Sequence, residues 1–437
     1  MKKLIKLLMP VVISLSASGA SIDYLMNNSS VYLGNPAQTA NISVESAFFN
    51  PAGLVYLDDG LYLNINAFLS SVEESTVLDG QKYKADDFPV TPSFNLVYKK
   101  EKFSYYFNTS IIAGGATLNF KDGVPGLELA AQGINKLDPL KNTSRALNAN
   151  LENGNFDGEN RYFQGAVGIS YLLNDKVSVS LGGKYVYGIR KLSGHAEYSY
   201  NKSSPLGAVV DGNALHIDSK RTADGFGGIL GIDIKPTDTL NIALKFETPV
   251  KLNFKASTSE DEKIYLGFLN RSLGISTFYP EYKDGNKMRR DLPAVLSAGV
   301  SNKINKVTLL FSYNHYFNKA ANIDNQNYDD GNEAGIGIMY DINDKFTWTA
   351  GINIADTGAS RATYDDTEFA LNSQLYGTGV IFKPNEKNEF VLSLAYIHYN
   401  SENGVDEHFV PGADFEKSKV RYKKSITSLG LGYTYKF

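Results

Sequence analysis

Residues 177–190 read Val-Ser-Val-Ser-Leu-Gly-Gly-Lys-Tyr-Val-Tyr-Gly-Ile-Arg and alternate between two kinds of side chain. The odd positions carry Val, Leu, Tyr or Ile, apart from Gly183, whereas Ser178, Ser180, Lys184 and Arg190 occupy even positions. A period of two is that of a β-strand whose two faces meet different surroundings. The stretch is therefore predicted to be a strand with one apolar face and one polar face.

The same alternation recurs along most of the chain after Gly60. It predicts about fourteen strands, near residues 60–69, 93–98, 103–120, 163–173, 177–189, 225–235, 240–257, 291–301, 306–317, 333–342, 346–353, 370–383, 389–399 and 426–437. Short connections alternate with long ones at 70–92, 121–162, 190–224, 258–290, 318–332, 354–369 and 400–425. Short turns at one end, long loops at the other and an even strand count are typical of a bacterial outer-membrane barrel.

Lipid cannot hydrogen-bond to a free strand edge, so a sheet in a membrane must close. The expected fold class is therefore all-β, a transmembrane antiparallel β-barrel whose apolar face meets lipid and whose polar face lines the lumen. A soluble all-β protein with two packed sheets is the alternative. Strands of about ten residues with loops of alternating length favour the membrane barrel.

The composition excludes several other classes of protein. The 437 residues include 28 Tyr, 24 Phe and 39 Gly but no Cys, and the formal net charge is -4. A chain without Cys has no disulfides, thiolate zinc sites or Cys nucleophiles, and a chain without a basic excess is not expected to bind nucleic acid. The His residues show no metal-ligand spacing, and no Gly-x-Ser-x-Gly motif or Ser/His/acid set is evident. We therefore expect no catalytic residue, no metal and no cofactor.

The N-terminus, residues 1–20, resembles a secretory signal peptide. Three lysines at positions 2, 3 and 6 precede an apolar run from Leu7 to Leu15, and the small residues Ser18-Gly19-Ala20 form a plausible cleavage site. An ordinary N-terminal helix is the alternative. No later window holds the roughly 20 apolar residues of a membrane helix. The chain is therefore expected to be exported to the outer membrane of a Gram-negative bacterium.

Residues 21–59 precede the first strand and do not alternate cleanly. A barrel of about fourteen strands has a lumen too wide for its own side chains to fill. Residues 21–59 are therefore predicted to plug a barrel formed by residues 60–437. This segment contains the sequence Phe48-Phe49-Asn50-Pro51-Ala52-Gly53-Leu54. A second Asn-Pro-Ala, at residues 35–37, lacks these flanks and is treated as a coincidence.

The sequence of residues 48–54 resembles the signature of the FadL family, outer-membrane transporters of long-chain fatty acids and other hydrophobic compounds. Looser similarities at 246–256, 292–293 and 432–437 extend this resemblance along the mature chain. In the family, the Asn-Pro-Ala tripeptide lies in an N-terminal hatch folded inside a fourteen-stranded barrel. The resemblance therefore implies that the hatch motif here consists of Phe48, Phe49, Asn50, Pro51, Ala52 and Gly53.

The resemblance also implies a route for the ligand. Gly114 and Gly115, in the third predicted strand, match the position of a kink that opens a gap in the barrel wall of family members. Two packing glycines are the alternative, because glycine within a strand marks either a bulge or a close approach. Through such a gap, long-chain fatty acids or similar molecules would diffuse passively and sideways into the membrane. Uptake of aromatic hydrocarbons by the same route and a role as a surface adhesin are the alternative functions.

Candidate ligand contacts come from strand parity and from the resemblance. Parity points Lys184, Lys245, Lys251 and Lys255 into the lumen, where a cation could meet a fatty-acid carboxylate. The resemblance adds the mature N-terminus, with Ile22, Tyr24 and Leu25. In the family the outer groove is usually built by the loops corresponding to 190–224 and 258–290, although here the longest and most Leu-rich loop is 121–162.

The expected partners follow from the same reasoning. They are a long-chain fatty acid or other hydrophobic small molecule, the outer-membrane lipid with its lipopolysaccharide, and the barrel-assembly machinery. The last is expected because Tyr433, Tyr435 and Phe437 resemble the C-terminal signal that this machinery reads. A barrel plugged by its own chain has no evident need of a partner subunit, so a monomer is expected.

Overall fold

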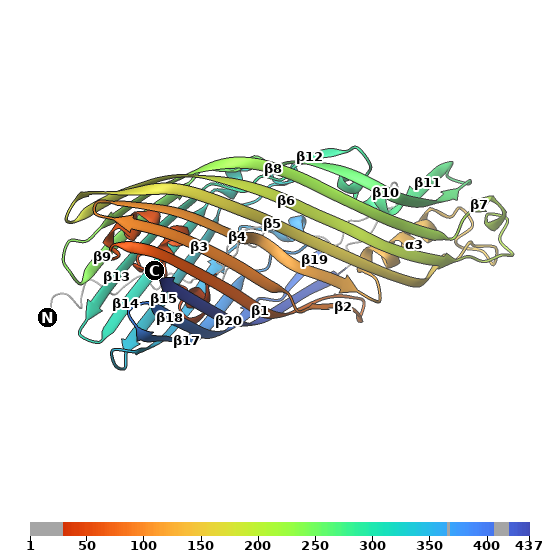
Figure 1. The fold of residues 1–437 in the computed structure, drawn as a ribbon. Helices are drawn as coiled ribbons and strands as arrows, with labels where there is room; N and C mark the ends of the chain where they lie inside the picture. The colour runs from red at the N-terminus through yellow and green to blue at the C-terminus, as the bar shows by residue number, and fades with distance from the viewer. Residues whose placement is uncertain (1–28, 365–367, 406–418) are drawn as a thin grey trace.

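A computed structural model describes residues 29–364, 368–405 and 419–437. In this part of the chain fourteen strands form one closed antiparallel barrel (Figure 1). They are β1 (Gly60–Leu78), β3 (Val90–Lys100), β4 (Phe103–Phe120), β5 (Asn150–Asn174), β6 (Val177–Ser199), β8 (Ala214–Ile234), β9 (Leu240–Glu247), β13 (Val295–Ile304), β14 (Val307–Tyr316), β15 (Gly331–Asp341), β16 (Phe346–Asp356), β17 (Ser373–Asn385), β18 (Asn388–Tyr399) and β20 (Lys419–Lys436). Closure joins β20 to β1, from Tyr62 opposite Lys436 to Leu78 opposite Val420. The predicted barrel is therefore confirmed, whereas the predicted signal peptide and Ile22, Tyr24 and Leu25 lie outside the described residues.

The strands run further than the alternation predicted at the end of the barrel that carries the long connections, here called the long-loop end. Because β5 begins at Asn150 and β6 continues to Ser199, segments predicted to be loops are partly strand. There β1 forms a hairpin with β2 (Gln81–Asp87), and β8 pairs with β10 (Asn253–Leu266). These extensions project on one side of the barrel, to the right in Figure 1. Their outward faces are polar, so the apolar alternation ends although the backbone pairing continues.

Shorter elements fill the long-loop end and the lumen. They are the strands β7 (Val210–Asp211), β11 (Arg271–Gly274), β12 (Lys287–Arg289) and β19 (Glu402–Val405), the helices α1 (Ser30–Gly34), α2 (Ser46–Phe49), α3 (Pro125–Leu137) and α4 (Ile275–Phe278), and the 3-10 turns η2 (Pro51–Tyr56), η3 (Gly207–Val209), η4 (Pro280–Tyr282), η5 (Asn318–Ala320) and η6 (Arg361–Thr363). The helix α3 starts with Pro125 at a position where its missing N–H costs nothing. It buries Leu127 and Ile134 in an apolar core shared with Phe156 and Leu192. No helix among the described residues is long and apolar enough to cross a bilayer.

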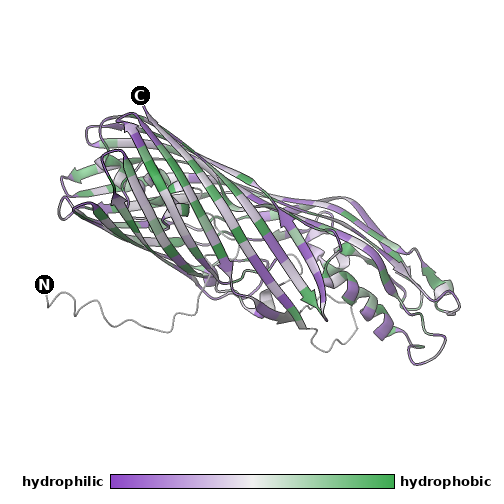
Figure 2. Ribbon diagram, turned by 90° about the horizontal axis from the view of Figure 1, so that it is seen from below, coloured by the Kyte–Doolittle hydropathy of each residue, from purple (hydrophilic) through white to green (hydrophobic). Residues whose placement is uncertain are grey.

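The two faces of the strands follow the predicted parity in most of the barrel. On the outer face Leu181 and Phe226 are 62% and 74% exposed, whereas Ser178 and Ser180 are buried on the inner face. Figure 2 shows hydrophobic and hydrophilic residues alternating along the strands. Outward apolar residues and an inward polar lining are what a barrel in lipid requires.

Parity inverts, however, between β9 and β10. Lys245 of β9 is buried on the inner face, but after the break that contains Pro249 the buried residues are even-numbered, among them Leu252. Proline cannot donate a ladder hydrogen bond, so the strand stops there and resumes in a different phase. Lys251 and Lys255 are consequently exposed on the outer face. The prediction that these two lysines face the lumen is wrong.

Candidate functional site

Residues 29–59, the described part of the predicted hatch, fold inside the barrel at the end opposite the long loops. The side chain of Asn50 donates two hydrogen bonds to β8, one to Oδ2 of Asp233 at 3.0 Å and one to the carbonyl oxygen of Ile232 at 3.2 Å. Both Asn50 and Asp233 are buried. The Asn of the motif therefore connects the hatch to the wall.

The next two residues of the motif bind the neighbouring wall strands through their carbonyl oxygens. Ser170 of β5 donates to the carbonyl of Pro51 at 2.6 Å, and Ser178 of β6 donates to that of Ala52 at 2.7 Å. The tripeptide thus bridges three consecutive strands, β5, β6 and β8. Pro51 also begins η2 at a position that needs no N–H donor. The motif is therefore an anchor that holds the hatch to the wall.

The aromatic residues of the motif pack inside the lumen. Phe49 stacks on Tyr32 of α1, with ring centroids 5.9 Å apart, and meets Phe48 edge to face at 5.2 Å. The hydroxyl of Tyr32 donates to the carboxylate of Glu333 on β15 at 2.7 Å, and that of Tyr316 on β14 donates to the same carboxylate at 2.7 Å. The buried carboxylate therefore holds α1 against the opposite side of the barrel.

A cavity of about 220 Å³ lies between the hatch and the long-loop end. Its floor includes Tyr32 and Leu33 of α1, and its sides include residues of β1, β17, β18 and β20. Most of its lining is apolar: Tyr32, Leu33, Phe68, Val72, Pro89, Ala116, Leu118, Leu192, Tyr282, Ala355, Leu371, Leu375, Ile397, Tyr399 and Ile426. On one side the lining also includes Gly114 and Gly115 of β4.

The wall beside this cavity is interrupted. The β4 strand pairs with β3 only as far as Ser110, and it pairs with β2 only at Asn119 and Phe120. Residues 111–118 thus have no backbone ladder on that side among the described pairings. On its other side, toward β5, the register shifts at 111–113 and again at 114–117. The cavity therefore meets the wall where one of its ladders is missing.

Two glycines produce the kink in β4. Gly114 and Gly115 have φ angles of +71° and +108°, which side-chain-bearing residues rarely adopt. A Cβ on Gly114 would lie only 2.0 Å from the carbonyl oxygen of Asn160 on β5. Both the backbone angle and the close approach therefore require glycine at position 114.

Charged side chains that line the cavity are already engaged. Glu74 of β1 forms an ion pair with Lys424 of β20, and Lys191 of β6 pairs with Glu159 at 2.8 Å. Glu333 accepts the tyrosine hydrogen bonds described above. Glu368 pairs with two arginines. Every charged group on the cavity lining thus has a partner within the chain.

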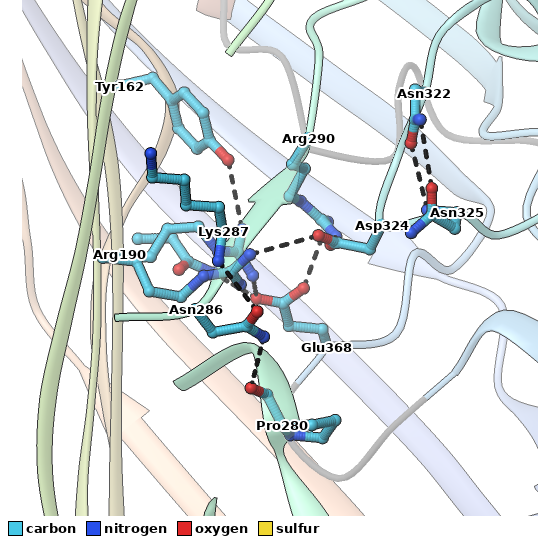
Figure 3. Close-up of polar contacts among 12 residues, drawn as sticks. Tyr162, Arg190, Pro280, Asn286, Lys287, Arg290, Asn322, Asp324, Asn325 and Glu368 are labelled. Atoms are coloured by element: carbon cyan, nitrogen blue, oxygen red, sulfur yellow. Dashed lines mark hydrogen bonds and ion pairs between the residues drawn. The ribbon is translucent and has the colours of Figure 1, made fainter. Parts of the chain in front are cut away.

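Above the cavity, the buried side chains of Arg190, Arg221 and Arg290 form a cluster with the partly buried carboxylates of Asp324 and Glu368. Figure 3 shows Arg190, Arg290 and both carboxylates. Arg290 lies 3.2 Å from Glu368 and also pairs with Asp324, while Arg221 of β8 lies 3.3 Å from Asp324. Arg190 of β6 pairs with Glu368 and donates to the hydroxyl of Tyr162 at 3.2 Å. The cluster ties the connection between β14 and β15 and the segment before β17 to the wall.

The charges within this cluster determine the ionisation of Asp324. Burial alone raises the pKa of its carboxyl, but the guanidinium groups of Arg290, Arg190 and Arg221 outweigh that effect. The pKa of Asp324 is therefore lower than that of an ordinary Asp. The cluster carries three guanidinium groups for two carboxylates, and it keeps both carboxylates fully paired.

Comparison with known proteins identifies the family. A family model described as "Outer membrane protein transport protein (OMPP1/FadL/TodX)" matches residues 161–437. The chain belongs to this family. FadL/TodX-family proteins are outer-membrane transporters of hydrophobic compounds, so the resemblance, the outer-membrane location and the general function predicted from the sequence are confirmed.

Solved structures share the fold of this FadL/TodX-family barrel at low sequence identity. A FadL homologue from Pseudomonas aeruginosa gives a TM-score of 0.66 at 14% identity, covering 94% of this chain and 99% of that one. The Pseudomonas putida toluene transporter TodX gives 0.61 at 13% identity, covering 90% and 94%. The Ralstonia pickettii toluene transporter TbuX gives 0.58 at 15% identity, covering 97% and 100%. A search of curated protein sequences found no match.

The lysines that were predicted to bind substrate do not line the cavity above the hatch of this FadL/TodX-family barrel. Lys184 and Lys245 do face the lumen, but both pair with Glu247, the latter at 2.5 Å. Lys245 also donates to the carbonyl oxygen of Phe48 in the hatch at 2.9 Å. They line a smaller cavity of about 60 Å³ beneath the first. Lys251, on the outer face, belongs to neither cavity.

Sequence reasoning missed the arginine cluster and Glu333. Arg190 did fall on the polar face of a predicted strand, so parity alone could have placed it in the lumen. Arg221, Asp324 and Glu368 fell in segments predicted to be loops, where no periodicity assigns a face. Their side chains meet only because distant segments fold together.

Proposed function

We propose that this chain carries neutral, compact hydrophobic molecules across the outer leaflet, passively and without catalysis. The ligand would enter from the long-loop end, occupy the cavity above the hatch, and leave sideways through the interrupted wall at Gly114 and Gly115. The observation that carries this proposal is the contact between cavity and wall. The lining of the cavity includes both glycines, and residues 111–118 of β4 lack a ladder on the β3 side.

Passive movement is consistent with the apolar lining. Each CH₂ group removed from water favours binding by about 0.8 kcal/mol, so an apolar cavity captures hydrocarbon without covalent chemistry. The membrane interior offers an equally apolar environment on the other side of the wall. The route would therefore lead from one apolar site to another, while the hatch keeps the lumen closed to polar solutes.

The charge pairing favours an uncharged ligand. Because the charged groups on the lining are already paired, an incoming carboxylate would displace one of them or lie buried without a partner, which is costly. The cavity volume of about 220 Å³ also suits a compact molecule, since an apolar cavity of about 150 Å³ holds benzene. The toluene transporters TodX and TbuX share the fold, which is compatible with this substrate class.

Long-chain fatty acids are the second candidate, and the arginine cluster is the observation in their favour. Arg190 and Arg290 hold Glu368 at the edge of the cavity. A fatty-acid carboxylate could take the place of the Glu368 carboxylate on these two guanidinium groups. That exchange would preserve the charge balance, but it requires the segment that carries Glu368 to move.

The test is uptake by cells that lack their own outer-membrane transporters of hydrophobic compounds. Cells expressing this chain would be given labelled toluene or labelled oleate, and the rates compared with those of cells carrying an empty vector. A double variant, Gly114→Val with Gly115→Val, would close the interruption in the wall. Gly165→Val is the matched control, because a Cβ at Gly165 of β5 meets no atom within 4 Å.

We expect toluene uptake that the double variant loses and the control keeps, with all barrels folded at the cell surface. Uptake retained by the double variant would overturn the lateral exit. Faster uptake of oleate than of toluene would overturn the neutral substrate class in favour of fatty acids. Failure to take up either compound by a folded barrel would contradict the transport proposal for both classes.

A further inference from the structure

The outer face of β8, β10 and β12 carries a group of exposed lysines that the transport route does not use. They are Lys220 on β8, Lys251 just before β10, Lys255 on β10 and Lys287 on β12. No ion pair within 4.0 Å involves any of these four side chains among the residues that the structure describes. They are therefore free to meet an external anion.

The strand register brings these like charges together. Lys255 lies directly opposite Lys287 in the antiparallel pair of β10 and β12. Lys220 lies directly opposite Lys191 of β6, whose ammonium is neutralised by Glu159 at 2.8 Å. Like charges directly opposite each other destabilise a sheet. The Lys255–Lys287 pairing therefore costs free energy unless an anion lies between the two ammonium groups.

Lys220 is close to this pair, because it faces Ser257 while Lys255 faces Thr222. Lys220 and Lys255 are thus diagonal neighbours on the same face, a separation of about 7–8 Å between their backbones. Asp218 and Asp224 share the outward face of β8, and neither forms an ion pair with the four lysines in the described structure. Asp284, in the connection between β10 and β12, is a third nearby carboxylate and accepts a hydrogen bond from the backbone N–H of Thr258 at 3.0 Å. Four cations and three anions leave a net positive charge in this group.

The height of the lysines relative to the apolar belt shows which layer of the membrane their partner occupies. On β8 the apolar outward residues end at Phe226, and the backbone of Lys251 lies beside Gly225, where a Cβ would come within 2.5 Å of its carbonyl oxygen. Lys220 is six residues beyond Phe226, roughly 20 Å along the strand and less in height because barrel strands tilt. The lysines therefore rise from the edge of the apolar belt through the layer of lipid headgroups.

We propose that Lys220, Lys251, Lys255 and Lys287 bind the phosphate groups of lipopolysaccharide, the phosphorylated glycolipid of the outer leaflet. Short turns face the periplasm in such barrels, so the long-loop end and these lysines face the outer leaflet. Phosphates at headgroup height would lie between Lys255 and Lys287 and relieve their repulsion. This site does not depend on which molecule the cavity carries.

The first test is binding of fluorescent lipopolysaccharide to the full chain purified in lipopolysaccharide-free detergent. A triple variant, Lys220→Gln with Lys255→Gln and Lys287→Gln, removes three of the four charges. The matched control, Lys176→Gln with Lys345→Gln and Lys387→Gln, removes three exposed lysines at the opposite, short-turn end. We expect the triple variant to bind about 100-fold more weakly, on the scale of a membrane-surface lysine, and the control to bind like the wild type.

A second measurement separates this role from a merely structural one. In lipopolysaccharide-free detergent, Lys287→Gln should raise the temperature at which the folded barrel is lost, because the repulsion with Lys255 disappears. The further rise that lipopolysaccharide causes should be smaller in this variant than in the wild type. A variant that is less stable without the lipid and gains as much from it as the wild type does would overturn the proposal.

Three other results would also overturn it. Equal binding of dephosphorylated lipopolysaccharide would show that the phosphates are not what the lysines recognise. Competition by inorganic phosphate at a concentration equal to that of the lipid phosphate would show a site for the free anion rather than for the lipid. Equal binding by the triple variant and the wild type would place the lipid elsewhere on the barrel.

Discussion

The side-chain amide of Asn50 donates a hydrogen bond of 3.0 Å to the carboxylate of Asp233, a residue 183 positions later in the chain. The amide of Asn241 on β9 donates to the same carboxylate oxygen at 3.1 Å. The buried carboxylate of Asp233 thus accepts hydrogen bonds both from the hatch and from the neighbouring strand β9. A shorter or apolar side chain at position 50 cannot make this connection.

Replacing Asn50 by Ala should therefore loosen the hatch without unfolding the barrel. Asn50 makes two hydrogen bonds to the wall, and removing the partner of a buried polar group costs about 1–3 kcal/mol, so local opening of the hatch should become roughly 30-fold more frequent. Hydrogen exchange of the amides in residues 46–57, followed by mass spectrometry, measures this opening. Exchange in the barrel strands should not change.

Asn41→Ala is the matched control for this variant. Asn41 also lies in the hatch and donates to Gln38 at 2.7 Å, but its side chain makes no hydrogen bond to the wall among the residues that the structure describes. Its removal should change the exchange of residues 46–57 little. Equal exchange in the Asn50 variant and the wild type would show that Pro51 and Ala52 hold the hatch without the Asn50 amide.

The arginine cluster predicts how stability depends on pH. The pKa of Asp324 in the folded protein lies below the value of about 3.9 in an unfolded chain. Its contribution is therefore complete above that unfolded value and is lost as the pH falls through the folded pKa. Breaking a buried pair costs about 3–5 kcal/mol, so Asp324→Asn should be less stable by about 3 kcal/mol at pH 7.

Urea unfolding of the refolded barrel between pH 8 and pH 3 measures this difference. The gap between Asp324→Asn and the wild type should stay constant down to about pH 4.5 and narrow only below it. Asp329→Asn is the control, because Asp329 pairs with Lys319 on the surface at 2.9 Å and is 79% exposed. A gap that already narrows between pH 7 and pH 6 would contradict the lowered pKa.

The part of the fold within the membrane could be predicted from sequence because lipid imposes one rule on every strand. Each outward position must be apolar, whereas an inward position need not be. The alternation in residues 177–190 therefore indicates which side chains face lipid and which face the lumen. The hatch could be found because the Phe48–Leu54 motif is local in sequence. Its anchoring partners could not, since Asp233, Ser170 and Ser178 are ordinary lumen residues until the hatch meets them.

The sequence-based predictions failed in two places. One is beyond the membrane, where outward side chains need not be apolar, and the other is the break in the strand at Pro249. Beyond the apolar belt, β5, β6 and β8 remain paired with polar side chains outward, which in sequence resembles a loop. At Pro249 the phase changes, so counting from Lys245 assigns Lys251 to the wrong face. The arginine cluster brings together Arg190, Asp324 and Glu368 from distant segments, which no local pattern encodes.

The inverted parity of β10 can be tested by single-cysteine labelling, because the natural chain has no Cys. Lys255→Cys lies on the outer face, whereas Lys245→Cys lies at a position that is 6% exposed in the lumen. A membrane-impermeant maleimide should label the folded Lys255→Cys barrel and leave the folded Lys245→Cys barrel unlabelled. Both should react after denaturation, which controls for reagent quality. Protection of both positions in the folded barrel would restore the uninterrupted strand that the sequence suggested.

The first Asn-Pro-Ala copy, at residues 35–37, provides a last prediction. Asn35 is completely buried, and a Cβ on Gly337 of β15 would lie 1.8 Å from its side-chain oxygen. Gly337→Ala should therefore displace the turn at Asn35 and destabilise the hatch by about 1–3 kcal/mol, as overpacking does. Gly165→Ala, which meets no atom within 4 Å, should have little effect.

Adding Asn35→Ala to Gly337→Ala removes the clashing oxygen. Hydrogen exchange of residues 30–40 should therefore be slower in the double variant than the sum of the two single effects predicts. Strictly additive effects would show that the two residues do not restrict each other.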